Sequence, residues 1–222
     1  RVAKQTGAIV IAISQRRNVI TVYQGDKKYV VEDISKIFTK ANQALQTLEK
    51  YKSVLDQAII SLNALEFKDL VTLYDVVLVV QKIEMVMRVT NIIDKYIIEL
   101  GVEGTLLSMQ VEELMGTTKI DQNQIIKDYQ RNTMTIKEFK KKIKDLSSEE
   151  LIDLTNIAKI LGYSGFTEDM DTPVRPNGYR ILNKIHRLPN SIIENLVNYF
   201  EDFQEILEAT IEDLDDVDGI GE

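Results

Sequence analysis

Cysteine is absent from the 222 residues, and histidine occurs once, as His186. The absence of cysteine excludes disulfides, thiolate metal sites and cysteine nucleophiles, and a single histidine excludes histidine-based zinc sites and most catalytic triads. No apolar run approaches the roughly 20 residues that would span a bilayer. The first residues resemble neither a signal nor a transit peptide, and without an initial Met we expect a fragment of a longer protein.

Charge of one sign dominates only parts of the chain. Apolar residues make up 44% and charged residues 28%, as in soluble globular proteins, and the net charge is −8. Residues 201–222 hold ten acids and no Lys or Arg, whereas 1–40 and 119–144 each hold eight bases and three acids. Bulk charge therefore does not favour coating of nucleic acid, but the basic segments could hold phosphates.

The segment 7–31 predicts β-strands. Residues 8–13 are a continuous apolar run, typical of a strand buried on both faces, and 19–23 and 28–31 are rich in β-branched and aromatic residues. Three strands are too few for a sandwich or barrel. We therefore expect the edge of a sheet whose other strands are absent.

From Asp33 the pattern becomes helical. Apolar residues recur every seven positions at Ile34, Ala41, Leu48, Leu55 and Leu62. Phe38, Leu45 and Ile59 fill most of the second heptad position, and Lys52 interrupts it. The pattern predicts a helix over 33–65, favoured as a bundle helix over a parallel coiled coil, that packs antiparallel on a helix 73–100. The contact residues are expected to be Leu48, Leu55, Ile59, Val76, Val80, Ile83 and Met87.

Shorter helices follow, and capping boxes mark several of their starts. The predicted helices are 104–115, 121–131, one from Thr135, one from Ser147 to Leu161, 179–186, 191–201 opened by Ser191 and Glu194, 203–209 and 211–216. Glycine and proline gather in 162–178, the best domain boundary. The expected domains are 1–32, 33–161 and 162–222, in a chain that is mostly α with a small β piece.

The C-terminal segment carries the pattern of a helix-hairpin-helix module. Gly219 and Gly221 permit a tight turn that points backbone N–H groups at a DNA phosphate, and a second helix is expected after residue 222. Residues 184–189 occupy the place of a first hairpin, 32 residues earlier. An ordinary left-handed turn and a plain helical turn remain the alternatives. Candidate DNA-binding residues are Lys184, Arg187, Gly219, Ile220 and Gly221, with Arg175 and Arg180 adding charge.

A polar loop at the end of the first strand is a candidate phosphate site. Ser14, Arg16 and Arg17 offer a hydroxyl and two guanidinium groups, whose planar forks match phosphate oxygens. A solvated turn is the alternative from the residues alone. Lys140–Lys142 is interpreted as a solvated helix face.

These segments also resemble a known family. Residues 1–20 closely resemble the end of a diadenylate cyclase domain, and 41–52 resemble the start of the helical linker in the DisA family of DNA integrity scanning proteins. Residues 178–185 and the terminal Gly-Ile-Gly resemble that family's helix-hairpin-helix domain. The chain is therefore identified as a member of the DisA family.

The resemblance implies a bacterial nucleotidyltransferase that condenses two ATP, with Mg²⁺ or Mn²⁺, into cyclic di-AMP and pyrophosphate. It implies a cytoplasmic, nucleoid-associated homo-octamer without a membrane segment, in which a helical spine separates the cyclase domains from modules that bind branched DNA. Junction DNA bound there is expected to lower cyclase output. These features imply a role in DNA damage and repair.

The chain also departs from the family pattern. The Asp-Gly-Ala motif, which supplies the metal carboxylate, and the Gly-Thr-Arg-His-Arg phosphate motif are expected before Arg1. We therefore expect no catalytic residue and no metal ligand in this chain. Ser14, Arg16 and Arg17 are the nucleotide-binding residues that the resemblance leaves in it. The chain alone should be inactive. The alternative is a stand-alone helix-hairpin-helix or helical oligomerisation module without catalysis. The strands favour the cyclase reading.

Overall fold

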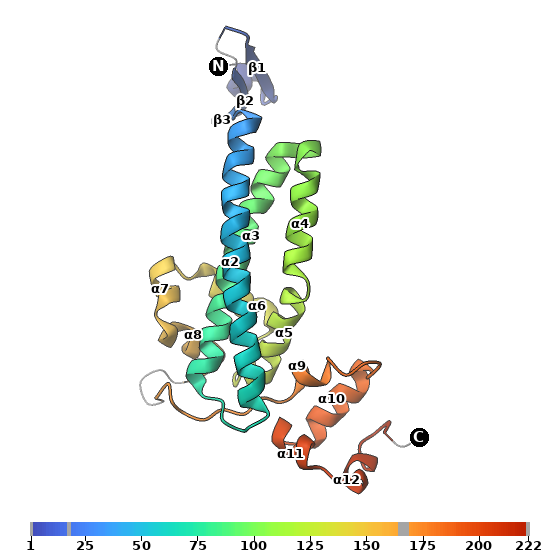
Figure 1. Ribbon diagram of the computed structural model, residues 1–222. Coiled ribbons are helices and arrows are strands. Elements are labelled where there is room, and N and C mark those ends of the chain that lie inside the picture. Colours follow the sequence, from blue (N-terminus) through green and yellow to red (C-terminus); the bar gives the residue numbers. More distant parts are fainter. Residues whose placement is uncertain (1, 17–18, 164–168, 221–222) are drawn as a thin grey trace.

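The β-branched segments near the N-terminus pair into one antiparallel sheet. The structure, a computed structural model, describes residues 2–16, 19–163 and 169–220. Strands β1 (Val10–Ser14), β2 (Val19–Gln24) and β3 (Lys27–Val31) lie in the order β1-β2-β3 at one end of the molecule (Figure 1). A short helix, α1 (Val2–Thr6), precedes them and was not predicted.

The prediction that the first strand is buried on both faces is wrong for this chain. Ile11 and Ile13 keep 63% and 71% of their surface exposed. Within the described residues no further strand pairs with β1, and no second layer covers its faces. The apolar run therefore forms a strand whose isoleucine side chains stay exposed within the described residues.

Two long helices form the spine of the molecule. Helix α2 (Ile34–Glu66) is capped by Asp33, whose carboxylate accepts from the Ser35 N–H at 2.9 Å, and α3 (Leu73–Leu100) starts at a capping box. The two pack antiparallel, as predicted, over a seam that includes Leu48, Leu55, Val76, Val80 and Ile83, all buried. Full burial of each such side chain contributes about 1.5–3 kcal/mol.

The remaining spine helices pack along the length of this pair (Figure 1). They are the 3₁₀ turn η1 (Gly101–Gly104), α4 (Thr105–Met115), α5 (Thr118–Tyr129), α6 (Ile136–Asp145), α7 (Ser148–Ile152) and α8 (Leu154–Leu161). The single helix predicted from Ser147 to Leu161 is wrong, because Asp153 interrupts it and caps α8 through the Thr155 N–H at 3.1 Å. Among the described helices none is both long and apolar enough for a membrane span.

Four short helices form a second packing unit, which we call the hairpin module (residues 178–220). They are α9 (Tyr179–Leu182), α10 (Asn190–Tyr199), α11 (Phe203–Glu208) and α12 (Ile211–Asp215). Leu182, Ile193, Leu196 and Val217 form their own small core. The predicted helix 179–186 ends early, at Leu182. Ser191 does not cap the next helix, since Glu194 bonds elsewhere and Pro189 occupies the cap position.

The chain between the two units first returns to the spine. Backbone groups of Met170 and Thr172 accept hydrogen bonds from Tyr74 and Leu73 at 2.9 Å, and Val174 donates to Val71 at 3.0 Å. Val174 belongs to the spine's core. The hairpin module therefore follows directly from a strap anchored on the first turn of α3.

Candidate nucleic-acid interface

Two turns in the hairpin module share one geometry. The Leu188 N–H donates to Ile185 at 3.3 Å, and the Ile220 N–H donates to Val217 at 3.0 Å, each closing a four-residue turn. The third residue of each turn has a positive φ, +65° at Arg187 and +84° at Gly219. The 32-residue spacing noted in the sequence therefore relates two equivalent turns.

The first turn, between α9 and α10, is exposed and basic. Lys184 and Arg187 are both exposed, and the described residues give neither side chain an ion pair or hydrogen bond. A positive φ is unusual for a residue with a Cβ. Arg187 therefore projects its guanidinium from a position that glycine would fill more easily.

The second turn requires its glycine. A Cβ on Gly219 would lie 2.7 Å from Cδ1 of Ile192, and its φ is left-handed. The turn is held further by Asn195, whose amide donates to the Asp218 carbonyl at 2.7 Å. Ile220 is half-buried and packs on the module's core rather than on the surface. Gly221 lies outside the described residues.

Acidic side chains surround the second turn. Asp213 accepts the Thr210 N–H at 2.8 Å and closes a capping box, and hydrogen bonds from Thr210 lower the pKa of its carboxyl. Asp215, Asp216 and Asp218 are exposed and follow it closely in sequence. Any phosphate at this turn would be bound by backbone N–H groups against unfavourable local charge.

Arg175 and Arg180 do not add charge to this surface, contrary to the sequence interpretation. Arg175 pairs with Asp69 and, at 3.0 Å, with Asp202. Arg180 has 0% exposure and is paired with Glu66. Both cations are therefore used to attach the hairpin module to the spine.

A buried polar cluster, which we call the joint, makes this attachment. It consists of Asn63 and Glu66 of α2, Asp128 and Tyr129 of α5, and Arg180 of α9. The Arg180 guanidinium donates to Glu66 and Asn63, and the Tyr129 hydroxyl donates to the other Glu66 oxygen at 2.6 Å. Burial, and then the neighbouring Glu66, raise the pKa of Tyr129, which keeps this hydroxyl a donor.

Asp128 of α5 holds the first residues of α9 in place through backbone hydrogen bonds. Its carboxylate accepts from the backbone N–H groups of Gly178, Tyr179 and Arg180 at 2.9, 2.6 and 3.0 Å. Burial raises the pKa of Asp128 to about 7, although the bonds from Arg180 and Tyr179 oppose that shift.

The joint was missed in the sequence, yet one signal was present. Glu66 continues the second heptad position of Phe38, Leu45 and Ile59. A carboxylate there indicates a buried partner, because an unpaired buried charge is strongly unfavourable. No spacing rule points to Arg180 as that partner.

The candidate nucleotide residues lie at the opposite end of the molecule. Ser14 ends β1 opposite Val19, and Arg16 is exposed in the turn that follows. Arg17 lies outside the described residues. Over the described ranges, no three His, Asp or Glu side chains are grouped as metal ligands.

The described residues form a helical spine that carries a small sheet at one end and a module of paired turns at the other. This is the architecture of a linker protein that holds two functional ends apart. The profile of the DisA bacterial checkpoint controller linker region matches residues 31–170. The chain is 75% identical over all 222 residues to the DNA integrity scanning protein DisA of Clostridioides difficile (strain 630), and covers 62% of that protein.

Further relatives carry the same name. Identity is 55% to the DNA integrity scanning protein DisA of Clostridium botulinum (strain Kyoto / Type A2) and 54% to that of Clostridium perfringens (strain 13 / Type A), again over all 222 residues. The chain spans 63% and 62% of these two relatives. It belongs to the DisA family of DNA integrity scanning proteins.

Proposed function

We propose that the chain is the spine and DNA-sensing part of a diadenylate cyclase. In this proposal the complete protein condenses two ATP into cyclic di-AMP and pyrophosphate, and branched DNA bound at the hairpin module lowers that activity. The observation that carries the proposal is the 75% identity, over all 222 residues of this chain, to a protein named for DNA integrity scanning, together with two equivalent turns on one module.

The hairpin module supports the DNA part through backbone chemistry. Each turn exposes main-chain groups beside a positive-φ residue, and the first adds the charges of Lys184 and Arg187. Such contacts go to phosphates, so they position DNA without reading its sequence. Two turns on one rigid core can hold two phosphate groups at a fixed separation, which suits recognition of DNA shape.

The sheet supports the nucleotide part. Ser14 ends β1, Arg16 lies in the turn that follows and Arg17 is the next residue in the sequence. Strand β1 presents apolar side chains that a larger sheet would cover. We propose that the remaining third of the protein completes this sheet and brings the carboxylate that holds Mg²⁺ or Mn²⁺. The ion would stabilise charge on the ATP phosphates. In this chain, Arg16 and Arg17 would bind and orient those phosphates.

Assembly is part of the same proposal. Condensing two ATP requires two nucleotide sites to face each other, and a homo-octamer provides such pairs. The cytoplasm and nucleoid would be its location, because both ATP and chromosomal DNA are found there. A stand-alone DNA-binding module would leave the exposed β1 unexplained.

Two measurements on the full-length protein test the proposal. With ATP and Mg²⁺ or Mn²⁺, chromatography should detect cyclic di-AMP, and a four-way DNA junction should reduce the rate. Linear duplex of equal length is the control for branching. Absence of the dinucleotide with both metals would refute the cyclase assignment, and equal effects of junction and linear DNA would refute the sensing role.

A further inference from the structure

Helix α6 has one buried face and one basic face. Phe139 and Ile143 are buried in the spine core, whereas Lys137, Lys141 and Lys144 are exposed. The three lysines are spaced i, i+4 and i+7, so they lie along one side of the helix. At 1.5 Å per residue they extend over about 10 Å, the length of roughly three base-pair steps of DNA.

A lysine from α5 joins this face. The ammonium groups of Lys119 and Lys140 are close enough that burial and then Lys119 lower the pKa of Lys140. Among the described residues, none of the five lysines of this surface has an ion pair; they are Lys119, Lys137, Lys140, Lys141 and Lys144. Gathered like charges without an ion-pair partner favour binding of an anion from outside.

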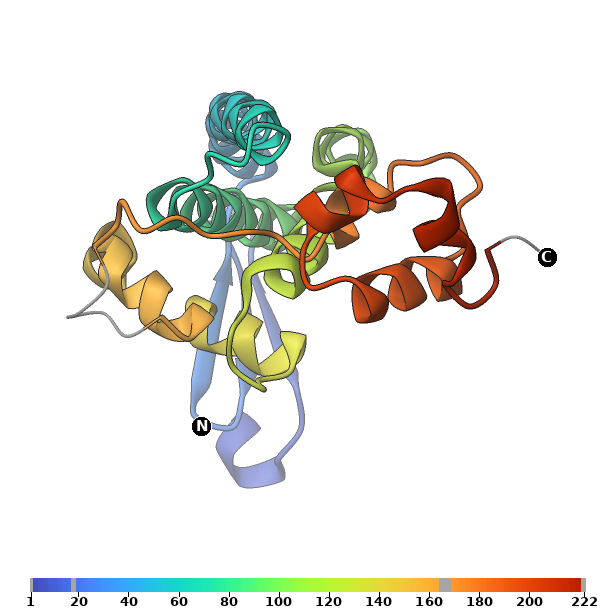
Figure 2. The same ribbon diagram turned by 90° about the horizontal axis from the view of Figure 1, so that it is seen from below.

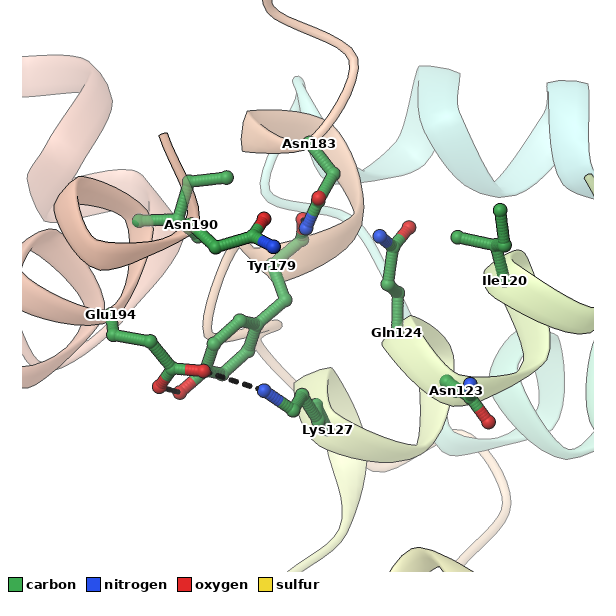
Figure 3. A pocket seen from close by; sticks show the side chains of 9 residues that line it. Ile120, Asn123, Gln124, Lys127, Tyr179, Asn183, Asn190 and Glu194 are labelled. Carbon is green, nitrogen blue, oxygen red and sulfur yellow. Dashed lines mark hydrogen bonds and ion pairs between the residues drawn. The ribbon is translucent and has the colours of Figure 1, made fainter. Parts of the chain in front are cut away.

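An amide-rich pocket lies where α5 meets the hairpin module, between residues that follow Lys119 on α5 and residues that flank the first turn. Helix α5 packs on both α6 and α9, and its side chains line a pocket of about 210 Å³ shared with α9 and α10. In Figure 3 the amides of Gln124, Asn183 and Asn190 are directed toward the same space. Figure 2 shows α5 between α6 and the hairpin module.

The acid in this pocket does not oppose an anion. Glu194 accepts from Lys127 at 2.6 Å and from the Tyr179 hydroxyl at 2.8 Å, so its charge is balanced within the pocket. The uncharged amides around it can donate to phosphate and sugar oxygens. Helix α5 thus carries residues of the pocket and also Lys119, next to α6.

We propose that these five lysines and the amide pocket form a second DNA-contacting surface, the spine track, along which a DNA arm held at the first turn continues. The proposal rests on the proposed DNA binding by the hairpin module. It adds positive charge that the C-terminal segment, with ten acids and no base, lacks. DNA is favoured over a membrane because none of the large apolar side chains of α6, all of which the structure describes, is exposed.

A charge-matched comparison in the full-length protein tests the spine track. The test variant is K137Q/K141Q/K144Q, and the control is K36Q/K50Q/K95Q, which removes three exposed lysines from α2 and α3. Binding of a labelled four-way junction is titrated at several salt concentrations. The test variant should bind roughly tenfold more weakly, and its slope of log K against log salt should be shallower by about 2.7.

A third variant separates the spine track from the proposed DNA binding by the hairpin module. K184Q/R187G removes the charges of the first turn while glycine preserves its positive φ. If this variant loses affinity and the spine variant matches its control, the spine track is refuted and binding by the hairpin module stands. If neither variant differs from wild type, both proposals fail. Binding of each variant to anionic lipid vesicles is measured in parallel. If K137Q/K141Q/K144Q loses binding to the vesicles but keeps its binding to the junction, the spine track is also refuted.

Discussion

Removing the carboxylate of Glu66 should destabilise the protein severely. Glu66 and Arg180 are both fully buried, and Glu66 also accepts from Tyr129 at 2.6 Å. In Glu66→Met the Arg180 guanidinium stays buried without a counter-charge. Breaking a buried ion pair in this way costs about 3–5 kcal/mol. For a chain of this length that lowers the melting temperature by roughly 6–20 °C.

The partner variants make the prediction specific to the pair. Arg180→Met should be destabilising as well, because it leaves the buried Glu66 carboxyl group without its ion-pair partner. The double variant Glu66→Met/Arg180→Met removes both members of the pair and should melt above either single variant. It should remain below wild type, because Tyr129 and Asn63 lose hydrogen-bond partners at about 1–3 kcal/mol each.

Circular dichroism melts at one pH and salt concentration measure all four proteins. Lys40→Gln, which removes a partner of the exposed pair with Glu32, is the surface control and should melt close to wild type. Additive losses in the double variant would show that Glu66 and Arg180 act independently. A Glu66→Met protein that melts like the control would refute the reasoning on the joint.

Four further outcomes are expected. Leu55→Asp buries an unpaired carboxylate in the α2–α3 seam and should abolish the cooperative melt. A variant that melts like wild type would show that Leu55 is not in the core. Because the folded-state pKa of Asp128 is about 7, above its unfolded value of 3.8, its stabilising effect is complete below about pH 4 and falls as the pH rises toward 7. Denaturation of Asp128→Asn against wild type should therefore show a wild-type advantage that shrinks over that range, and a constant difference would contradict it. In the full-length protein, Arg16→Ala/Arg17→Ala should weaken ATP binding, since charge-assisted hydrogen bonds contribute about 1.5–3 kcal/mol each. Unchanged ATP affinity would favour the alternative interpretation, in which this loop is a solvated turn. The 222-residue chain alone should form no cyclic di-AMP on chromatography, and clear turnover would mean that the nucleotide site has been misplaced.

Periodicity and capping chemistry predicted the spine well. Leu48, Leu55 and Leu62 define the seam of α2, and α3 covers Leu73–Leu100, the range predicted for it. These signals are local, because a helix is specified by side chains three or four residues apart. Breaks such as Asp153 were missed because Asp also occurs within helices, and only its bond to Thr155 marks it as a cap.

The contacts between distant segments were not predictable in this way. Arg180 follows Glu66 by more than a hundred residues, and the sequence around Arg180 differs little from that of a solvated turn. Its burial depends on how α5 and α9 are placed. The turn at Arg187 was predictable only by its spacing from Val217, because nothing about arginine itself favours a positive φ.

Helix α2 connects the two ends of the molecule mechanically. It starts three residues after β3 and ends in the joint at Glu66, so one continuous rod runs from the sheet to the attachment of the hairpin module (Figure 1). At 1.5 Å per residue its 33 residues form a lever about 50 Å long. A tilt of about 5° at the joint would displace the sheet end by about 4 Å, a distance greater than a hydrogen bond. In the function proposed above, a small angular change at the end that binds DNA would thereby be amplified into a displacement large enough to separate reacting groups at the other.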